Sequence, residues 1–410
     1  MFRTTTPERH KTDMDTTLVP AHVPAELVRD FDYVDLRHEN DVYLHYKTLH
    51  DGPDIFYTPH YGGHWVVTRH EDMENILSNA KDFSNRHTTL PKQPVQILVS
   101  ESDGPIHGDY RRLVQPFFSP KAVEALEQQI RALTIDLIND FHAAGECEFT
   151  QDFALKMPIH IAMKLLDLPM EDTPFMLSVA QAALHSVDMQ KKVEAYGQIF
   201  QYLAEKILPE RKKNPGNDII SAIIHGKVEG GRATTDDEVL GISLALIAGA
   251  LDTVPNMLSF MTLFLARNPA HRQQLIEDPS LIPDAMEEMI RRHHLGNFTR
   301  VVIRDMDYKG LQFKAGDIVM SPTTLAGIDD RRYPDPMTVD FGRPDKKHLA
   351  FGRGPHSCIG VMLARSELRV FLSEWMKRIP HFEIKSGGQP VAKAAAVNHV
   401  LYLPLTWNVA

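Results

Sequence analysis

The residues best suited to chemistry surround a single cysteine near the C-terminus. Cys358 stands in the stretch FGRGPHSCIG, residues 351–360, directly before a pattern that predicts a helix over residues 361–378. Free backbone N–H groups and the helix dipole stabilise a thiolate at such a position, which suits it to bind a metal or attack an electrophile. The glycines of the stretch allow the backbone to fold tightly around the sulfur and a flat group to approach it. A lone cysteine is more often a small buried residue, so its surroundings decide between the two interpretations.

An acid and an alcohol interrupt the most apolar segment of the chain. Asp252 and Thr253 lie in a helical pattern that starts at a possible capping box at residues 235–238 and ends near residue 266. At about 1.5 Å per residue, this helix would be roughly 45–50 Å long and would cross the whole molecule. A threonine hydroxyl inside a helix can bond to the carbonyl four residues earlier, and Gly249 leaves room beside it. Pro255 removes one helical hydrogen bond, so we expect a kink nearby. Taken alone, the pair is equally compatible with a surface aspartate and a backbone-bonded threonine.

Two short spacings bring other charged groups together. His107 and Arg111 are four residues apart, so both cations fall on one helix face, where they could reach a pair of carboxylates. Glu288 and Arg291 are three residues apart and can form an ion pair. Each of these pairs, taken alone, is most often a solvated pair on the surface. Only their occurrence together with the other motifs indicates a functional role.

Periodicity elsewhere predicts mainly helix with a small β portion. A helix is expected after Ser119, which can cap it, with Pro120 at the first helical position. Further helical patterns cover residues 71–77, 158–166, 193–207 and 284–293. Short strands are expected at residues 65–68, 301–303, 311–313 and 318–320.

The composition limits the class of protein. The 410 residues carry 44 Lys and Arg against 54 Asp and Glu, a formal net charge of -10 without a basic tract, which argues against a nucleic-acid partner. Two cysteines cannot build a disulfide framework, a cysteine-rich zinc site or a four-thiolate iron–sulfur cluster, and they favour the reducing cytoplasm. The first 20 residues are polar, and the longest apolar stretch, residues 239–251, is too short to span a bilayer, so no membrane partner is expected. We expect one domain over residues 1–410, with a short polar N-terminal extension to about residue 20.

Taken together, the motifs resemble those of the cytochrome P450 superfamily. The loop at residues 351–360 has the pattern F-x-x-G-x-x-x-C-x-G of the haem-ligating loop, and Ala248 to Thr253 is similar to the A-G-x-D/E-T motif. Residues 107–111 look like the H-x-x-x-R motif, and residues 288–291 look like the E-x-x-R motif. The resemblance spans nearly the whole chain, including residues 62–65 and 403–407, and is closest to the bacterial camphor 5-monooxygenase group.

The resemblance implies a mainly α P450 fold that holds haem, ligated by the Cys358 thiolate, between the long central helix and the cysteine loop. It implies catalytic roles for Asp252 and Thr253, which deliver protons while O2 is activated. The further residues that it implies fall into two groups. Those binding haem are His107, Arg111, Arg300, His356, Phe351, Gly352 and Gly249, and those forming a buried structural cluster are Glu288, Arg291 and Arg343.

The resemblance also implies partners. The chain carries no nucleotide or flavin fingerprint, so electrons would come from an NADH-dependent reductase through a [2Fe–2S] ferredoxin. A ferredoxin is usually acidic, and the candidates for a basic docking patch are Arg111, Arg112, Lys346 and Lys347. We expect a monomer.

The substrate is expected to be apolar and larger than camphor. In camphor hydroxylases a tyrosine before the H-x-x-x-R helix bonds the ketone, but residues 88–102 contain none. A wide, weakly polar pocket favours a terpenoid or norisoprenoid such as an ionone-like ketone. By resemblance its walls are Val95, Leu184, Ala245, Ala248, Gly296, Phe298, Ala396 and Val397.

The substrate, the function and the residues that hold Asp252 each leave a question open. Camphor or another monoterpene is a second substrate hypothesis, and a peroxide-driven peroxygenase or a non-catalytic haem protein are rival functions that the Asp252 and Thr253 pair disfavours. Relatives hold the aspartate by basic residues of a neighbouring helix, where this chain has Leu177 and His185. We therefore hypothesise that His185 titrates near neutrality and makes turnover depend on pH.

Overall fold

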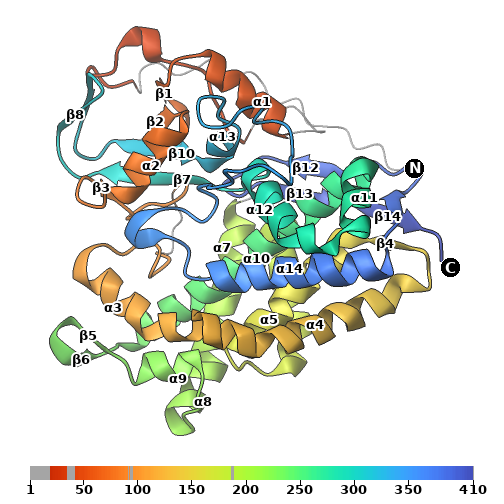
Figure 1. The fold of residues 1–410 in the computed structure, drawn as a ribbon. Coiled ribbons are helices and arrows are strands. Elements are labelled where there is room, and N and C mark those ends of the chain that lie inside the picture. The colour runs from red at the N-terminus through yellow and green to blue at the C-terminus, as the bar shows by residue number, and fades with distance from the viewer. Residues whose placement is uncertain (1–18, 35–41, 91, 93–95, 186–188, 410) are drawn as a thin grey trace.

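The computed structural model describes residues 19–34, 42–90, 92, 96–185 and 189–409, without the side chains of residues 183–185, 189 and 192. Helices dominate this part of the chain (Figure 1). They are α1 (Val42–Thr48), α2 (His70–Ser78), α3 (Gly104–Val114), α4 (Pro120–His142), α5 (Lys156–Leu165), α6 (Thr173–His185), α7 (Met189–Tyr202), α8 (Leu208–Lys213), α9 (Ile219–Ile224), α10 (Asp236–Arg267), α11 (Pro269–Glu277), α12 (Ile282–Arg292), α13 (Thr323–Gly327) and α14 (Val361–Arg378).

The strands form several small sheets that lie in different parts of the molecule (Figure 1). The largest sheet has the order β1 (Ile55–Thr58), β2 (His64–Val67), β10 (Ile318–Pro322), β7 (Asn297–Val302) and β3 (Phe83–Ser84). A second sheet has the order β11 (Phe382–Ile384), β14 (Pro404–Trp407) and β4 (Glu146–Glu148). Two-stranded pairs are β12 (Val391–Lys393) with β13 (His399–Tyr402), β5 (Lys227–Val228) with β6 (Arg232–Ala233), and β8 (Met306–Tyr308) with β9 (Leu311–Phe313).

Helix α10 is the long helix that the capping signal predicts. The Thr235 hydroxyl accepts from the backbone N–H of Glu238, and the Glu238 carboxylate accepts from the N–H of Thr235, so the capping box forms. The helix continues through Pro255 and ends at Arg267. By length and composition alone it could cross a membrane, but most of that apolar stretch is buried, as in the core helix of a globular protein.

The two halves of α10 belong to different packed regions, and the site lies where they meet. The first half packs with the apolar side chains of α5 to α9. The second half packs with those of the main sheet, α12 and α14. Helix α14 lies along α4, as Figure 1 shows, and its first turn follows the cysteine loop directly. The loop before α14 and the middle of α10 line the same cavity, so they face each other across it.

Local differences from the expected elements have simple causes. The pattern over residues 193–207 predicts one helix, but α7 ends at Tyr202 and one π-helical turn, Leu203–Ile207, leads into α8. The strand expected at residues 301–303 is β7, which begins earlier and pairs with β10 along five residues. Because β7 is buried on both faces, its sequence lacks the alternation of apolar and polar residues that would have indicated where the strand begins.

Candidate functional site

A cavity of ≈ 380 Å³ lies between the middle of α10 and the cysteine loop. One wall is a single face of α10, which contributes Ala245, Leu246, Gly249, Ala250 and Thr253. The opposite wall is formed by the loop itself and the start of α14. Most of the lining is apolar, so the cavity suits a flat, largely apolar group with a few polar contacts at its rim.

The loop holds Cys358 with its side chain open to the cavity. The N–H of Cys358 donates to the carbonyl of Phe351 over 2.8 Å, which closes the loop. Gly352 and Gly354 have positive φ angles of 68° and 71°, and a Cβ on Gly354 would lie 2.8 Å from the Cα of Ser78. Only glycine fits both conformation and space there.

Burial raises the pKa of the Cys358 thiol, whereas the N–H of Gly360 and the cation of Arg111 oppose that shift. A coordinated metal ion would add a positive charge that favours the thiolate. The guanidinium of Arg111 also donates to the carbonyl of Ser357 over 2.8 Å and so braces the loop beside the sulfur.

Cationic and imidazole side chains gather at the rim of the cavity. Arg300 is buried in β7, where its Nη1 donates to the carbonyl of Thr299, and burial lowers its pKa to about 10. The rings of His107 and His356 are stacked with centroids 3.9 Å apart. Within the described residues, His107 Nε2 and His356 Nδ1 are buried without a hydrogen-bonding partner. Burial, followed by the charges of His107 and Arg300, lowers the pKa of His356 to about 3. A bound anion would satisfy these nitrogens and reverse that shift.

The face of α10 opposite the sulfur combines open space with a hydroxyl. Thr253 lines the cavity, and its Oγ1 donates to the carbonyl of Gly249 over 3.0 Å, as the sequence predicts. A Cβ on Gly249 would meet no atom within 4 Å, so the glycine leaves the helix surface free for a flat group. Asp252 points elsewhere: its Oδ1 accepts from Asn256 Nδ2 over 2.9 Å and lies 3.5 Å from Nδ1 of His399.

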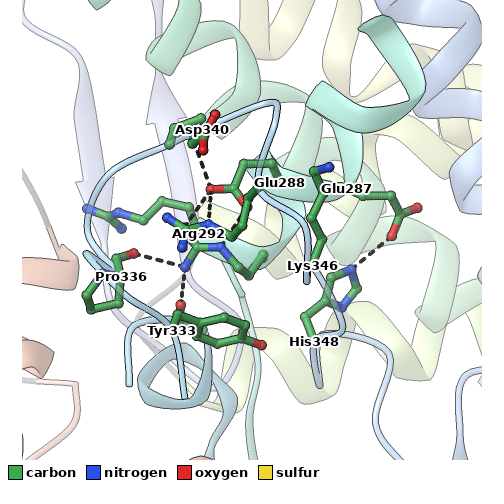
Figure 2. Close-up of polar contacts among 12 residues, drawn as sticks. Glu287, Glu288, Arg292, Tyr333, Pro336, Asp340, Lys346 and His348 are labelled. Carbon is green, nitrogen blue, oxygen red and sulfur yellow. Dashed lines mark hydrogen bonds and ion pairs between the residues drawn. The ribbon is translucent and has the colours of Figure 1, made fainter. Parts of the chain in front are cut away.

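A buried ionic cluster lies behind the loop. Glu288 contacts Nε of Arg291 over 2.7 Å and Nε of Arg343 over 3.0 Å. Figure 2 shows this carboxylate beside Asp340, whose N–H donates to it over 3.0 Å. The carboxylate and the guanidinium of Arg291 are fully buried, so each charge depends on its partners. The cluster ties α12 to residues 327–343, the segment that precedes the loop.

Comparison with known proteins decides the family. A family model described as "Cytochrome P450" matches residues 159–402, more than half of the chain. The chain belongs to this family. A relative described as "Probable cytochrome P450 127A1", from Sinorhizobium fredii, is 32% identical over 96% of this chain and 97% of its own length.

Solved P450 structures agree with the fold. The structure described as CYP101J2 is 36% identical, covers 95% of this chain and 99% of its own, and has a TM-score of 0.87. That of CYP101C1 is 32% identical, covers 95% and 100%, and also has a TM-score of 0.87. This P450 is therefore close to the CYP101 group, and it is an oxidoreductase with a cysteine-ligated haem.

The cavity of this P450 fits haem. A flat macrocycle matches the space between Gly249 and Cys358, and the two propionates of haem are anions that could accept from the unpartnered imidazole nitrogens of the rim. We propose that Cys358 holds the iron and that the remaining residues of the predicted set hold the macrocycle. They are His107, Arg111, Arg300, His356, Phe351, Gly352 and Gly249, of which all but His107 line the cavity directly.

Some of the residues predicted to form the substrate wall line the cavity. Ala245, Gly296, Phe298 and Val397 line the cavity. Ala248 and Ala396 do not: Ala248 lies on the opposite side of α10 from Thr253, and Ala396 uses its carbonyl to accept from Asn297 in the neighbouring segment. Val95 and the side chain of Leu184 lie outside the described residues.

The predictions missed many lining or supporting residues, among them Leu246, Asp103 and Glu367. Leu246 lines the cavity one position after Ala245, as the helical period alone would have indicated. Asp103 lies 3.6 Å from His356 and accepts from the N–H of Asn85, so it supports the rim. Glu367 lines the cavity from α14, and burial raises its pKa to about 8.

The residues proposed to hold Asp252 are not seen doing so. Leu177 is a partly buried apolar residue of α6 and has no charge to offer. The side chain of His185 lies outside the described residues, so its titration stays a prediction. The structure instead brings His399, from the distant strand β13, next to Asp252.

Replacing Arg300 with leucine should weaken haem retention by roughly 10- to 100-fold. The variant removes a buried cation whose charge-assisted hydrogen bond to a propionate is worth about 1.5–3 kcal/mol. The rate of haem transfer to apomyoglobin measures this loss. Arg304→Leu is the matched control, because Arg304 is exposed just after β7 and pairs with Asp82 instead. Equal transfer rates for the two variants would show that Arg300 does not hold the haem.

Proposed function

We propose that this P450 hydroxylates an apolar terpenoid or norisoprenoid, such as an ionone-like ketone, with O2 and electrons from a [2Fe–2S] ferredoxin and its NADH-dependent reductase. The observation that carries this proposal is the pairing of a weakly polar cavity with Thr253 and Gly249 on the helix face opposite Cys358. An apolar substrate and a proton-delivering hydroxyl would then meet in one space.

When bound, haem supplies O2 activation and insertion of one oxygen atom into a C–H bond. The protein's part is to place protons and substrate. The Thr253 hydroxyl faces the cavity and can exchange its bond to the Gly249 carbonyl for one to a group in the cavity. Asp252 is about one-quarter exposed, so its carboxylate can exchange protons with solvent and pass them on by rotating towards Thr253.

The substrate would be positioned by shape more than by polar contacts. Ala245, Leu246, Gly296, Phe298 and Val397 offer no side-chain hydrogen bond. An apolar wall of this kind discriminates weakly between molecules that differ by one methylene. This favours a bulky apolar substrate with loose orientation over a small ketone held by a tyrosine.

Electron delivery is proposed at the outer face of the cysteine loop. Cys358 also lines a shallower hollow on that side, bounded by Arg111, Arg112 and Met362. Arg112 is two-thirds exposed, although it pairs with Asp109. Lys346 pairs with Asp284 and Lys347 is exposed. An acidic ferredoxin fits this face by charge.

Reconstituted turnover tests the proposal. We expect NADH, ferredoxin and reductase to support O2 consumption in step with a hydroxylated product from an ionone, while peroxide alone gives none. A screen of the Soret band should show large shifts with ionones and small ones with camphor. Product formation with peroxide alone would favour the peroxygenase, and O2 binding without product would favour a non-catalytic haem protein.

Replacing Gly296 with valine should narrow the cavity and weaken binding of an ionone about tenfold. A Cβ at this position would lie 2.3 Å from the ring of Phe298, so the ring must move. Such overpacking typically costs about 1–3 kcal/mol. Spectral titration measures the dissociation constant, and Gly197→Ala, on an exposed face of α7 with no neighbour within 4 Å, is the control. Unchanged ionone affinity in Gly296→Val would show that Phe298 does not contact the substrate.

A further inference from the structure

A polar cluster joins α10 to β13 on the side of Asp252 away from the cavity. Asn256, one turn after Asp252, donates from Nδ2 to the Asp252 carboxylate over 2.9 Å. The same side chain accepts, at Oδ1, the N–H of Val400 over 3.0 Å. This one asparagine therefore fixes β13 against α10, and it places His399, the residue before Val400, beside the carboxylate.

His399 is buried and turns an unused nitrogen towards Asp252. Its side chain is 9% exposed, and its Nδ1 lies 3.5 Å from Oδ1 of Asp252. Among the described residues this nitrogen has no hydrogen-bonding partner. The distance is slightly too long for a hydrogen bond, so a small rotation of either side chain completes or breaks it. A buried imidazole nitrogen that faces a carboxylate at this distance is suited to carry a proton between the two groups.

Other charged or titratable groups near the pair do not compete for that proton. Tyr196 of α7 faces Asp252, and burial together with that carboxylate raises the pKa of Tyr196 to about 12, so the phenol stays neutral. Lys393 is the register partner of His399 on β12, and its side chain is exposed. Asp152, in the π-helical turn Thr150–Ala154 packed on β13, accepts from the N–H of Glu148.

We propose that His399 is the proton partner of Asp252, a positioning residue that holds and recharges the acid during turnover. The inference rests on the proposed function, in which Asp252 feeds protons towards Thr253. It assigns to a strand near the C-terminus the role that the sequence analysis expected of a helix residue, His185.

The step is a simple proton transfer. Protonated His399 pairs with the Asp252 carboxylate and holds it away from the cavity. Transfer of the Nδ1 proton to Oδ1 leaves a neutral imidazole and a neutral carboxylic acid, and the attraction between them falls. The acid is then free to rotate towards Thr253, and the imidazole regains a proton from water through the exposed side of the pair. Because the step needs protonated His399, proton delivery falls as pH rises through the titration of this histidine.

Titration of the imidazole tests the pairing independently of turnover. The probe is histidine-selective NMR of the haem-loaded, reduced carbonyl form, with the His399 resonance assigned by its loss in His399→Gln. In Asp252→Asn we expect the titration midpoint of this resonance to fall, because the carboxylate 3.5 Å from Nδ1 is gone. An unchanged midpoint would overturn the proposal.

The pH profile of turnover tests the role. We measure product formed per NADH between about pH 5.5 and 8.5, the range in which histidine titrates. Wild type should lose yield as pH rises, while His399→Gln should give a flat profile and about tenfold slower product formation at low pH. His381→Gln, an exposed histidine beside β11, should keep the wild-type profile.

The outcomes separate this proposal from the proposed function. A wild-type profile in His399→Gln would overturn the proton role even if the NMR midpoint moves. An absence of turnover in wild type with a shifted midpoint would overturn the proposed function and leave the pairing in place.

Discussion

Cys358→Ser should lower product formation by about a thousandfold or more, equivalent to about 4 kcal/mol in the barrier. Cys358 supplies the only thiol among the residues lining the described cavity. If it holds the haem iron, as proposed, its thiolate would donate electron density that favours O2 activation. A serine hydroxyl in the same place has almost the same size but remains protonated and donates weakly. The reduced carbonyl complex should lose the long-wavelength Soret band of thiolate ligation at the same time.

Cys147→Ala is the matched control for that experiment. Cys147 lies in β4, burial raises its pKa well above the usual range, and it pairs across the sheet with Leu405. Cys147 is not among the residues lining the cavity, so the variant should keep both the Soret band and the activity. Retention of the thiolate spectrum in Cys358→Ser would refute the assignment of the ligand.

Glu288→Gln should destabilise the protein by about 3–5 kcal/mol. The substitution removes the one carboxylate that contacts both Arg291 and Arg343, and Arg291 is fully buried. The guanidinium would keep its backbone carbonyl partners from Gly327 and Pro336 but lose its counter-charge. Urea unfolding, followed by circular dichroism, measures the loss, and we expect haem to dissociate earlier as well because the cluster supports the segment before the loop.

The neighbouring glutamate provides the control. Glu287 pairs with His348 (Figure 2). It also pairs with Arg365, and its side chain is one-quarter exposed. Water can compensate for the loss of its charge, so Glu287→Gln should cost about 1 kcal/mol or less. Similar urea midpoints for the two variants would show that the buried charge of Glu288 does not contribute more to stability than the partly exposed charge of Glu287.

Local signals in the sequence predicted the elements that carry the site. The cap at Ser119, the capping box at Thr235 and the limits of α14 are set by interactions within a few residues, and the structure confirms all three. The bond from Thr253 to Gly249 is equally local. Such features can be predicted because the partners are close along the chain.

Contacts between distant segments could not be predicted in the same way. Asp252 and His399 meet only because Asn256 binds the backbone of Val400 across 144 positions. Asp103 likewise lies beside His356 although the two are 253 residues apart in the sequence. Sequence periodicity does not predict contacts of this kind, because they depend on how β13 and the loop before α3 pack against the core.

A crystal structure of the haem-bound protein would show directly whether Cys358 is the ligand. We expect iron bonded to Cys358 Sγ, the macrocycle against Gly249 and Thr253, and the propionates on Arg300, His107, His356 and Arg111. Iron ligated by a histidine, or haem bound outside this cavity, would contradict this expectation.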